Sequence, residues 1–134
     1  MKEENKTAKA ITLLLQQTQD GFLRWEAHTP GEDLTQGTAR LVETVYFAEK
    51  EQQTLRLYSY RDRFYTDEEV WHWEDGVALE LSDKKGISWW QFPGHPIIWD
   101  LLEAVRFKTA GADAFIDKLL EEGEAPSEPG PTGG

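Results

Sequence analysis

The chain has 134 residues, of which 39% are hydrophobic and 12% are aromatic, and its formal net charge is −11. This length and apolar content are typical of one globular domain and argue against a disordered chain. The absence of cysteine excludes disulfides, thiolate metal sites and cysteine nucleophiles. A negative field of this size repels phosphate backbones and anionic lipid, so we expect neither nucleic-acid nor membrane binding and weakly favour a basic partner.

Hydropathy along the chain gives no export or membrane signal. The apolar run over residues 10–15 is too short for the core of a secretory signal, and no run approaches the length that spans a bilayer. We therefore expect a cytoplasmic protein. The acidic charge also has a simple explanation, which is that it keeps the protein in solution.

The first predicted element is a helix over residues 6–18, where apolar residues recur at helical spacing before Gly21. The period then changes to the alternation that is typical of half-buried strands. This alternation predicts five strands over residues 23–28, 41–47, 55–65, 70–81 and 87–92. We expect a bulge at Asp75-Gly76 in the fourth strand, because glycine tolerates the backbone angles of a bulge.

Two further helices are predicted after Pro96, a residue that fits the first turn of a helix. The first runs to about Thr109, and the second, after Gly111, has an apolar side of Phe115, Ile116, Leu119 and Leu120 that we expect to be buried. Short links between strands favour antiparallel pairing. The predicted fold is therefore α+β: an N-terminal helix, a five-stranded antiparallel β-meander and two C-terminal helices packed on one face.

The same patterns predict the domain organisation. Residues 1–123 form a single α+β domain, and residues 124–134 form a disordered tail rich in proline, glycine and glutamate.

A string of aromatic and apolar segments between Leu55 and Leu120 carries a family resemblance. These segments are Arg56–Tyr58, Phe64–Tyr65, Trp71–Trp73, Leu79–Leu81, Trp90–Pro93, Asp100–Val105 and Ala110–Ile116. Together they resemble a group of small bacterial proteins that have an aromatic-rich sheet, a closing helical pair and no assigned activity. The resemblance implies a fold and a bacterial origin, and it transfers no catalytic residue.

Residue types that carry catalysis do not fall into a known motif. His28, His72 and His95 lack metal-ligand spacing, no serine lies in a nucleophile elbow, and there is no glycine-rich phosphate loop. We therefore predict that the protein is not an enzyme and has no catalytic residue, cofactor or metal. Three alternatives stay open: an enzyme of unknown reaction, a metal site at His72, and a sulfur-carrier role for the terminal Gly133-Gly134, although the helix order does not fit a β-grasp fold.

Six tryptophans are too many for one small core to bury fully. Trp89 and Trp90 are neighbours in a strand and point to opposite faces, so we expect one of them in the core. Tryptophan, tyrosine and arginine dominate binding hot spots, and the third and fourth strands are rich in all three. The predicted partner-binding residues, on one aromatic face of the sheet, are Tyr58, Tyr60, Arg61, Arg63, Trp71 and Trp73.

The opposite face of the same strands is expected to be core. Leu55, Leu57, Leu79 and Leu81 are predicted to pack beneath Ile98, Leu102, Phe115 and Leu119. The alternative explanation of the aromatic residues is that they form cross-strand pairs that only stabilise the sheet.

The first functional hypothesis is a non-enzymatic protein–protein interaction module. It would bind a protein partner through the aromatic face or through an edge strand, and a homodimer is one such case. The second hypothesis is an acidic inhibitor or immunity-type partner of a basic enzyme such as a nuclease. It rests on the net charge and on acidic runs over residues 67–69, 74–75 and 121–124.

Overall fold

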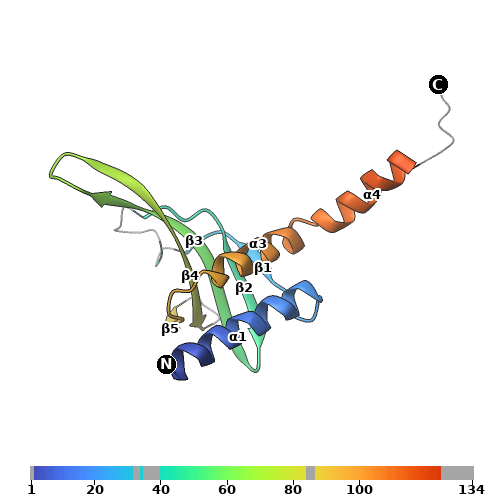
Figure 1. Cartoon of the computed structure of the whole chain (residues 1–134), viewed down its shortest axis with the longest axis horizontal. Coiled ribbons are helices and arrows are strands. Elements are labelled where there is room, and N and C mark those ends of the chain that lie inside the picture. Colours follow the sequence, from blue (N-terminus) through green and yellow to red (C-terminus); the bar gives the residue numbers. More distant parts are fainter. Residues whose placement is uncertain (1, 32–33, 35–39, 84–86, 125–134) are drawn as a thin grey trace.

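The computed structural model describes residues 2–31, 34, 40–83 and 87–124 of the chain. It contains an N-terminal helix, one five-stranded antiparallel sheet in the order β1-β2-β3-β4-β5 and two C-terminal helices, which confirms the predicted α+β class (Figure 1). The bounds are α1 Lys2–Gln19, β1 Glu26–His28, β2 Val45–Lys50, β3 Gln53–Tyr65, β4 Trp71–Ser82, β5 Ser88–Gln91, α3 Ile97–Thr109 and α4 Ala112–Glu124.

Strand β1 is shorter than predicted and β2 begins later than predicted. The residues before each strand form hydrogen bonds with other parts of the chain instead of pairing in the sheet at these positions. The N–H of Leu23 donates to the Gln17 carbonyl at 3.1 Å, and the Trp25 indole N–H donates to Thr18 Oγ1 at 3.0 Å. These bonds tie the segment before β1 to the end of α1, where Leu23 and Trp25 are buried. Leu41 lies before β2 and forms an isolated bridge with Arg61 instead.

The link between β2 and β3 is a two-residue turn. Both of its residues are left-handed, with φ of 53° at Glu51 and 68° at Gln52. Turns of this kind match the right-handed twist of the strands they join. The turn is therefore tighter than the gap between the second and third predicted strands, residues 48–54.

The pairing of β3 with β4 runs unbroken from Thr54 opposite Ser82 to Tyr65 opposite Trp71. The predicted bulge at Asp75-Gly76 is therefore wrong, and the irregularity lies at Leu81/Ser82, where β4 meets β5. A glycine is needed at position 76 for a different reason. It lies opposite Tyr60, and a Cβ at this position would collide with the tyrosine ring.

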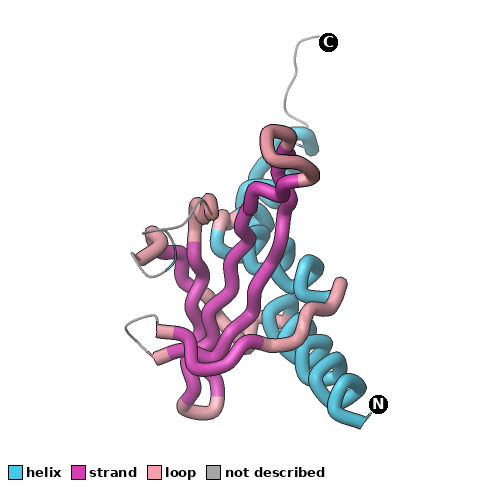
Figure 2. The backbone as a smooth tube through the Cα atoms, turned by 90° about the vertical axis from the view of Figure 1, so that its left-hand side faces the viewer, coloured by secondary structure: helices cyan, strands magenta, loops and turns pink. Residues whose placement is uncertain are grey.

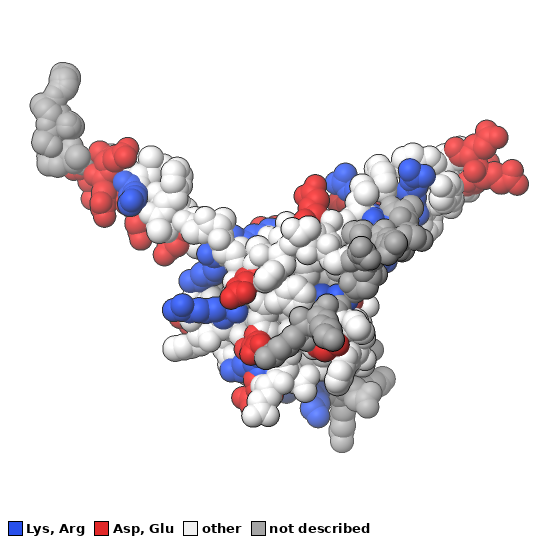
Figure 3. All heavy atoms as spheres, turned by 180° about the vertical axis from the view of Figure 1, so that it is seen from behind, with Lys and Arg blue, Asp and Glu red and all other residues white. Residues whose placement is uncertain are grey.

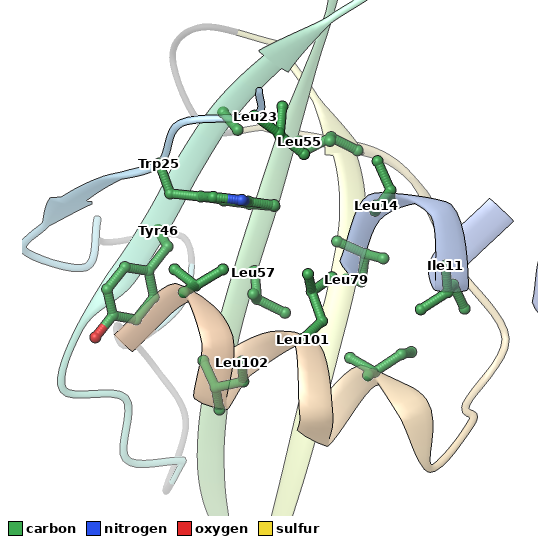
Figure 4. Close-up of a cluster of buried hydrophobic side chains, with 13 residues drawn as sticks. Ile11, Leu14, Leu23, Trp25, Tyr46, Leu55, Leu57, Leu79, Leu101 and Leu102 are labelled. Carbon is green, nitrogen blue, oxygen red and sulfur yellow. The ribbon is translucent and has the colours of Figure 1, made fainter. Parts of the chain in front are cut away.

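The main core lies between one face of the sheet and the helices α1 and α3 (Figure 2). Leu55, Leu57 and Leu79 point from β3 and β4 towards Ile11 and Leu14 of α1 and towards Leu101 and Leu102 of α3 (Figure 4). The predicted packing of the strand leucines beneath Ile98 and Leu102 is confirmed. A smaller cluster on the opposite face comprises Leu34, Val45, Tyr58 and Ala78, so the centre of the sheet is covered on both faces.

The last helix does not pack on the sheet, so the prediction that Phe115 and Leu119 lie over the strand leucines is wrong. No residue of α4, which the structure describes throughout, is buried. The place beside α3 is filled by α1, whose Ile11 and Leu14 complete the core. After Gly111, with φ of 69°, the chain enters α4 directly and leads away from the body (Figure 1).

Two arms therefore project from the body of the protein. One, the hairpin arm, consists of residues 61–75, the outer part of the β3–β4 hairpin; the other, the helical arm, is α4. They diverge from the same side of the body (Figures 1 and 3). Among the described residues, no helix is both long and apolar enough to cross a membrane. The predicted tail lies outside the described residues from position 125 onwards.

Candidate functional site

One face of the hairpin arm gathers an arginine and three aromatic side chains, which we call the aromatic–arginine cluster: Arg63, Tyr65, Trp71 and Trp73. Arg63 lies opposite Trp73 and Tyr65 lies opposite Trp71 in the register, so all four side chains share a face. The Arg63 guanidinium carbon is 4.8 Å from the ring centroid of Trp71 and 5.6 Å from that of Trp73. The two tryptophan rings meet edge to face with centroids 5.2 Å apart.

These contacts hold the cluster in place without burying it. Cation–π contacts at exposed sites contribute about 0.5–1 kcal/mol, and aromatic pairs contribute a similar amount. Tyr65, Trp71 and Trp73 nevertheless remain 54%, 40% and 36% exposed. The cluster is thus a preorganised apolar surface with a cation at its centre.

The base of the arm is fixed by three further contacts. Arg61 pairs with Asp75 directly across the strands at 2.9 Å, on the same face as the cluster. Arg40 forms two hydrogen bonds to Asp62, of 2.9 and 3.0 Å, and its guanidinium lies 3.8 Å from the ring centroid of Tyr60. The hydrogen bond to Asp62 raises the pKa of Arg40 above its ordinary value. The arm is therefore anchored where it leaves the sheet.

The predicted single aromatic face is wrong, because the structure divides the predicted residues between two faces. The register of β3 and β4 is unbroken, so Trp71 and Trp73 keep the parity of Leu79 and extend the helix-covered face outward. Of the predicted set, the structure brings together Arg61, Arg63, Trp71 and Trp73. It places Tyr58 and Tyr60 on the opposite face, where Tyr58 is buried.

Tyr65 is a member of the cluster that the sequence analysis did not include. The available signal was its parity, since it lies two residues after Arg63 and therefore on the same face of the strand.

The opposite face holds a buried polar network built on the cross-strand pair Arg56 and Glu80. The Arg56 Nε and Nη2 atoms both lie 2.6 Å from Glu80 Oε1, and the Tyr58 hydroxyl donates to Glu80 Oε2 at 2.8 Å. The two charged side chains are only 3% and 5% exposed. Burial, together with the adjacent carboxylate, raises the pKa of the Tyr58 phenol above its ordinary range. These groups satisfy one another, and the network links β3 to β4.

A groove of about 700 Å³ lies on this face over β1 and β2. Its wall is partly apolar, with Phe22, Leu34 and Phe47, and carries charges of both signs, including Arg24 and Glu49. A lining with charges of both signs favours neither an anionic nor a cationic ligand.

His72 lies 3.4 Å from Glu74, and the described part of the chain contains no group of three or more potential metal ligands.

Both Trp89 and Trp90 are exposed, so the prediction that one of them is core is wrong. The reason is that β5 is a short edge strand which pairs with the end of β4 alone. Gly133 and Gly134 lie outside the described residues.

Comparison of the chain with family models, with curated proteins and with solved structures gives no match.

Proposed function

We propose that the protein is an interaction module that binds another protein through the aromatic–arginine cluster of the hairpin arm. The observation that carries this proposal is that three large aromatic side chains and an arginine lie exposed on a projecting arm. A two-stranded ribbon of this kind is marginal in water, so a long one decorated with exposed aromatics has a cost that binding would offset.

The chemistry of the cluster favours a protein partner. Tryptophan, tyrosine and arginine supply most of the strong contacts at protein interfaces. The contacts of Arg63 with Trp71 and Trp73 order these side chains before binding, which reduces the entropy lost on association. A nucleic acid is disfavoured, because Asp67, Glu68 and Glu69 follow at the tip of the arm.

The test compares capture of the partner by two tryptophan variants. Trp73→Ala removes one of the two rings that Arg63 contacts, while Trp89→Ala removes a more exposed tryptophan from edge strand β5. Both proteins should keep the circular dichroism spectrum of the wild type and lose less than about 1 kcal/mol of stability, because neither side chain is buried. Affinity purification from the source cells with mass spectrometry should recover the partner with wild type and Trp89→Ala, and not with Trp73→Ala.

Two results would count against the proposal. Capture of the same proteins in equal amount by Trp73→Ala and by the wild type would remove the cluster from the interface. Alternatively, a Trp73→Ala protein that unfolds would assign this tryptophan a structural role.

A second candidate function, an acidic inhibitor of a basic enzyme, is favoured by where the acidic residues lie. Asp67, Glu68 and Glu69 form the end of the hairpin arm, and acidic residues also gather near the end of α4 (Figure 3). Acidic groups at the tip of a projecting hairpin suit entry into a cationic cleft. An association rate with a basic partner that falls steeply with salt, and falls again in a triple Asp67→Asn, Glu68→Gln, Glu69→Gln variant, is the expected result. A rate insensitive to ionic strength refutes it.

A further inference from the structure

The helical arm is amphipathic, and no residue along its apolar side is buried by the part of the chain that the structure describes. Phe115, Ile116, Leu119 and Leu120 recur at helical spacing along one stripe of α4. They are 65%, 42%, 53% and 57% exposed, respectively. A helix of this length is marginal in water on its own, and most helical stability in proteins comes from packing of the apolar face. A partner that covers the stripe would therefore stabilise the helix.

The charge of α4 restricts what that cover is. The helix carries five acidic residues (Asp113, Asp117, Glu121, Glu122 and Glu124) and one basic residue, Lys118, which gives a net charge of −4. Pairing this helix with the same helix of a second copy would bring two such charges together, which is unfavourable. An apolar surface with a cation is a better match.

The hairpin arm offers that surface. The arm as a whole is acidic, with two arginines against six acidic residues over residues 61–75, but its cluster face is not. On that face Arg61 is balanced by Asp75, and Arg63, which lies over the rings of Trp71 and Trp73, adds one positive charge. Aromatic rings can cover the apolar stripe of α4 while Arg63 meets the carboxylates that flank it.

We propose that the partner of the hairpin arm is α4 of a second copy, so that two chains form a reciprocal dimer in which each hairpin arm packs on the other chain's helical arm. This inference rests on the proposed function, since it names the partner of the same cluster. The two arms diverge from one side of the body (Figure 1), so each is open to the unlike arm of a second copy related by a twofold axis. The interface as a whole is isologous, because the contact between a hairpin arm and α4 forms twice, once on each side of the twofold axis.

The exposed apolar area agrees with this arrangement. Aromatic side chains offer about 150–250 Å² each, so the exposed fractions of Phe115 and the three aromatic residues of the cluster leave roughly 300–500 Å² uncovered per copy. The three aliphatic side chains of the α4 stripe bring this area towards the ~800 Å² that each partner buries in an interface of standard size.

The first experiment measures mass by analytical ultracentrifugation over a range of concentrations. The wild type should sediment as a dimer, and Trp73→Ala and Leu119→Asp should each sediment as monomers, because each change breaks both contacts of a homodimer. Phe22→Asp serves as the matched control, since Phe22 is 80% exposed and lies on neither arm, and it should remain dimeric. A monomeric wild type overturns the proposal.

Mixing the two variants then separates unlike-arm pairing from like-arm pairing. In a mixed dimer, the intact α4 of the Trp73→Ala chain meets the intact hairpin of the Leu119→Asp chain, so one of the two contacts is restored. Tagged Trp73→Ala should therefore capture untagged Leu119→Asp, and should capture untagged Trp73→Ala much less. Equal capture of the two, or no capture of Leu119→Asp at high concentration, overturns the reciprocal dimer.

Cross-linking gives a second measurement in proteins whose arms are intact. The chain has no cysteine, so single cysteines can be introduced cleanly. Gly123→Cys lies in line with the stripe of α4, and Ser59→Cys lies on the face of the cluster, two residues before Arg61. A short bismaleimide should join the unlike variants in a mixture, and preferential joining of two Gly123→Cys chains would overturn the proposal in favour of helix–helix pairing.

Failure of this inference is distinguishable from failure of the proposed function. If the wild type is a monomer and Trp73→Ala still abolishes capture of another protein, the second copy is the wrong partner and the cluster remains the binding site. If Trp73→Ala neither reduces the dimer nor reduces capture, both are wrong.

Discussion

Replacing Glu80 with alanine tests whether water is excluded from the Arg56–Glu80 pair on the face of the sheet opposite α1 and α3. In the wild type, one carboxylate oxygen of Glu80 accepts both bonds from Arg56 at 2.6 Å, and the other accepts the Tyr58 hydroxyl at 2.8 Å. Glu80→Ala removes the carboxylate that pairs with the buried guanidinium and removes the acceptor of the Tyr58 hydroxyl.

The magnitude follows from these two losses. Removing one partner of a buried ion pair costs about 3–5 kcal/mol, and an orphaned buried hydroxyl costs about 1–3 kcal/mol. Because the two groups share one site and relax together, we expect a total of about 4–6 kcal/mol, a large part of the ~5–15 kcal/mol that stabilises a typical domain. With a urea slope of about 2 kcal/mol/M, the midpoint of unfolding should fall by about 2–3 M.

The double variant Arg56→Met, Glu80→Leu is the matched control. It removes both charges and keeps apolar volume in their place, and such replacements are often neutral or stabilising. We therefore expect urea unfolding of the double variant, followed by circular dichroism, to lie close to that of the wild type. A loss below about 1 kcal/mol in Glu80→Ala would refute the reasoning, because it would mean that water already reaches the pair.

Three further changes test other parts of the fold. Leu79→Ala should cost about 2–5 kcal/mol in urea or thermal unfolding, because Leu79 is fully buried between the sheet and the helices; a smaller loss would mean that the core collapses around the gap. Gly76→Ala should cost about 1–3 kcal/mol, because the new methyl group displaces the Tyr60 ring from Arg40, and a stabilised variant would contradict this. In a spectrophotometric titration, one of the four tyrosines should ionise late and Tyr58→Phe should remove that step, because the folded state raises the pKa of Tyr58. The associated stability is complete below about pH 10 and is lost as pH rises towards the folded pKa; four tyrosines ionising together in the native protein would contradict the buried phenol.

The types and order of the elements were predictable because they depend on local patterns. The change from helical spacing near Ile11 to alternation after Leu23, and back again after Pro96, is visible in the sequence. The ends of β1 were less predictable, because the side chain of Trp25 bonds to Thr18 of a different element.

The candidate site was predicted in part. A bulge at Gly76 would have shifted the alternation of β4, so the prediction placed Trp73 and Leu79 on opposite faces of the strand. The glycine instead makes room for the Tyr60 ring, and the two residues share a face. The apolar stripe of α4 showed that the helix needs a partner surface. Which surface covers the stripe is a tertiary matter, because α1 and α4 are both amphipathic and both could have filled the place beside α3. The sequence patterns do not decide between them.

The packing of α1 against α3 has a consequence for the order of folding. The two helices lie near opposite ends of the sequence, with the whole sheet between them, so their contact closes a long loop and is entropically the slowest to form. The β3–β4 hairpin, in contrast, joins neighbouring residues and can form within microseconds of leaving the ribosome. During synthesis, Ile11 and Leu14 therefore stay uncovered until α3 has emerged, so the nascent chain exposes the apolar side of α1 while the whole sheet is being made.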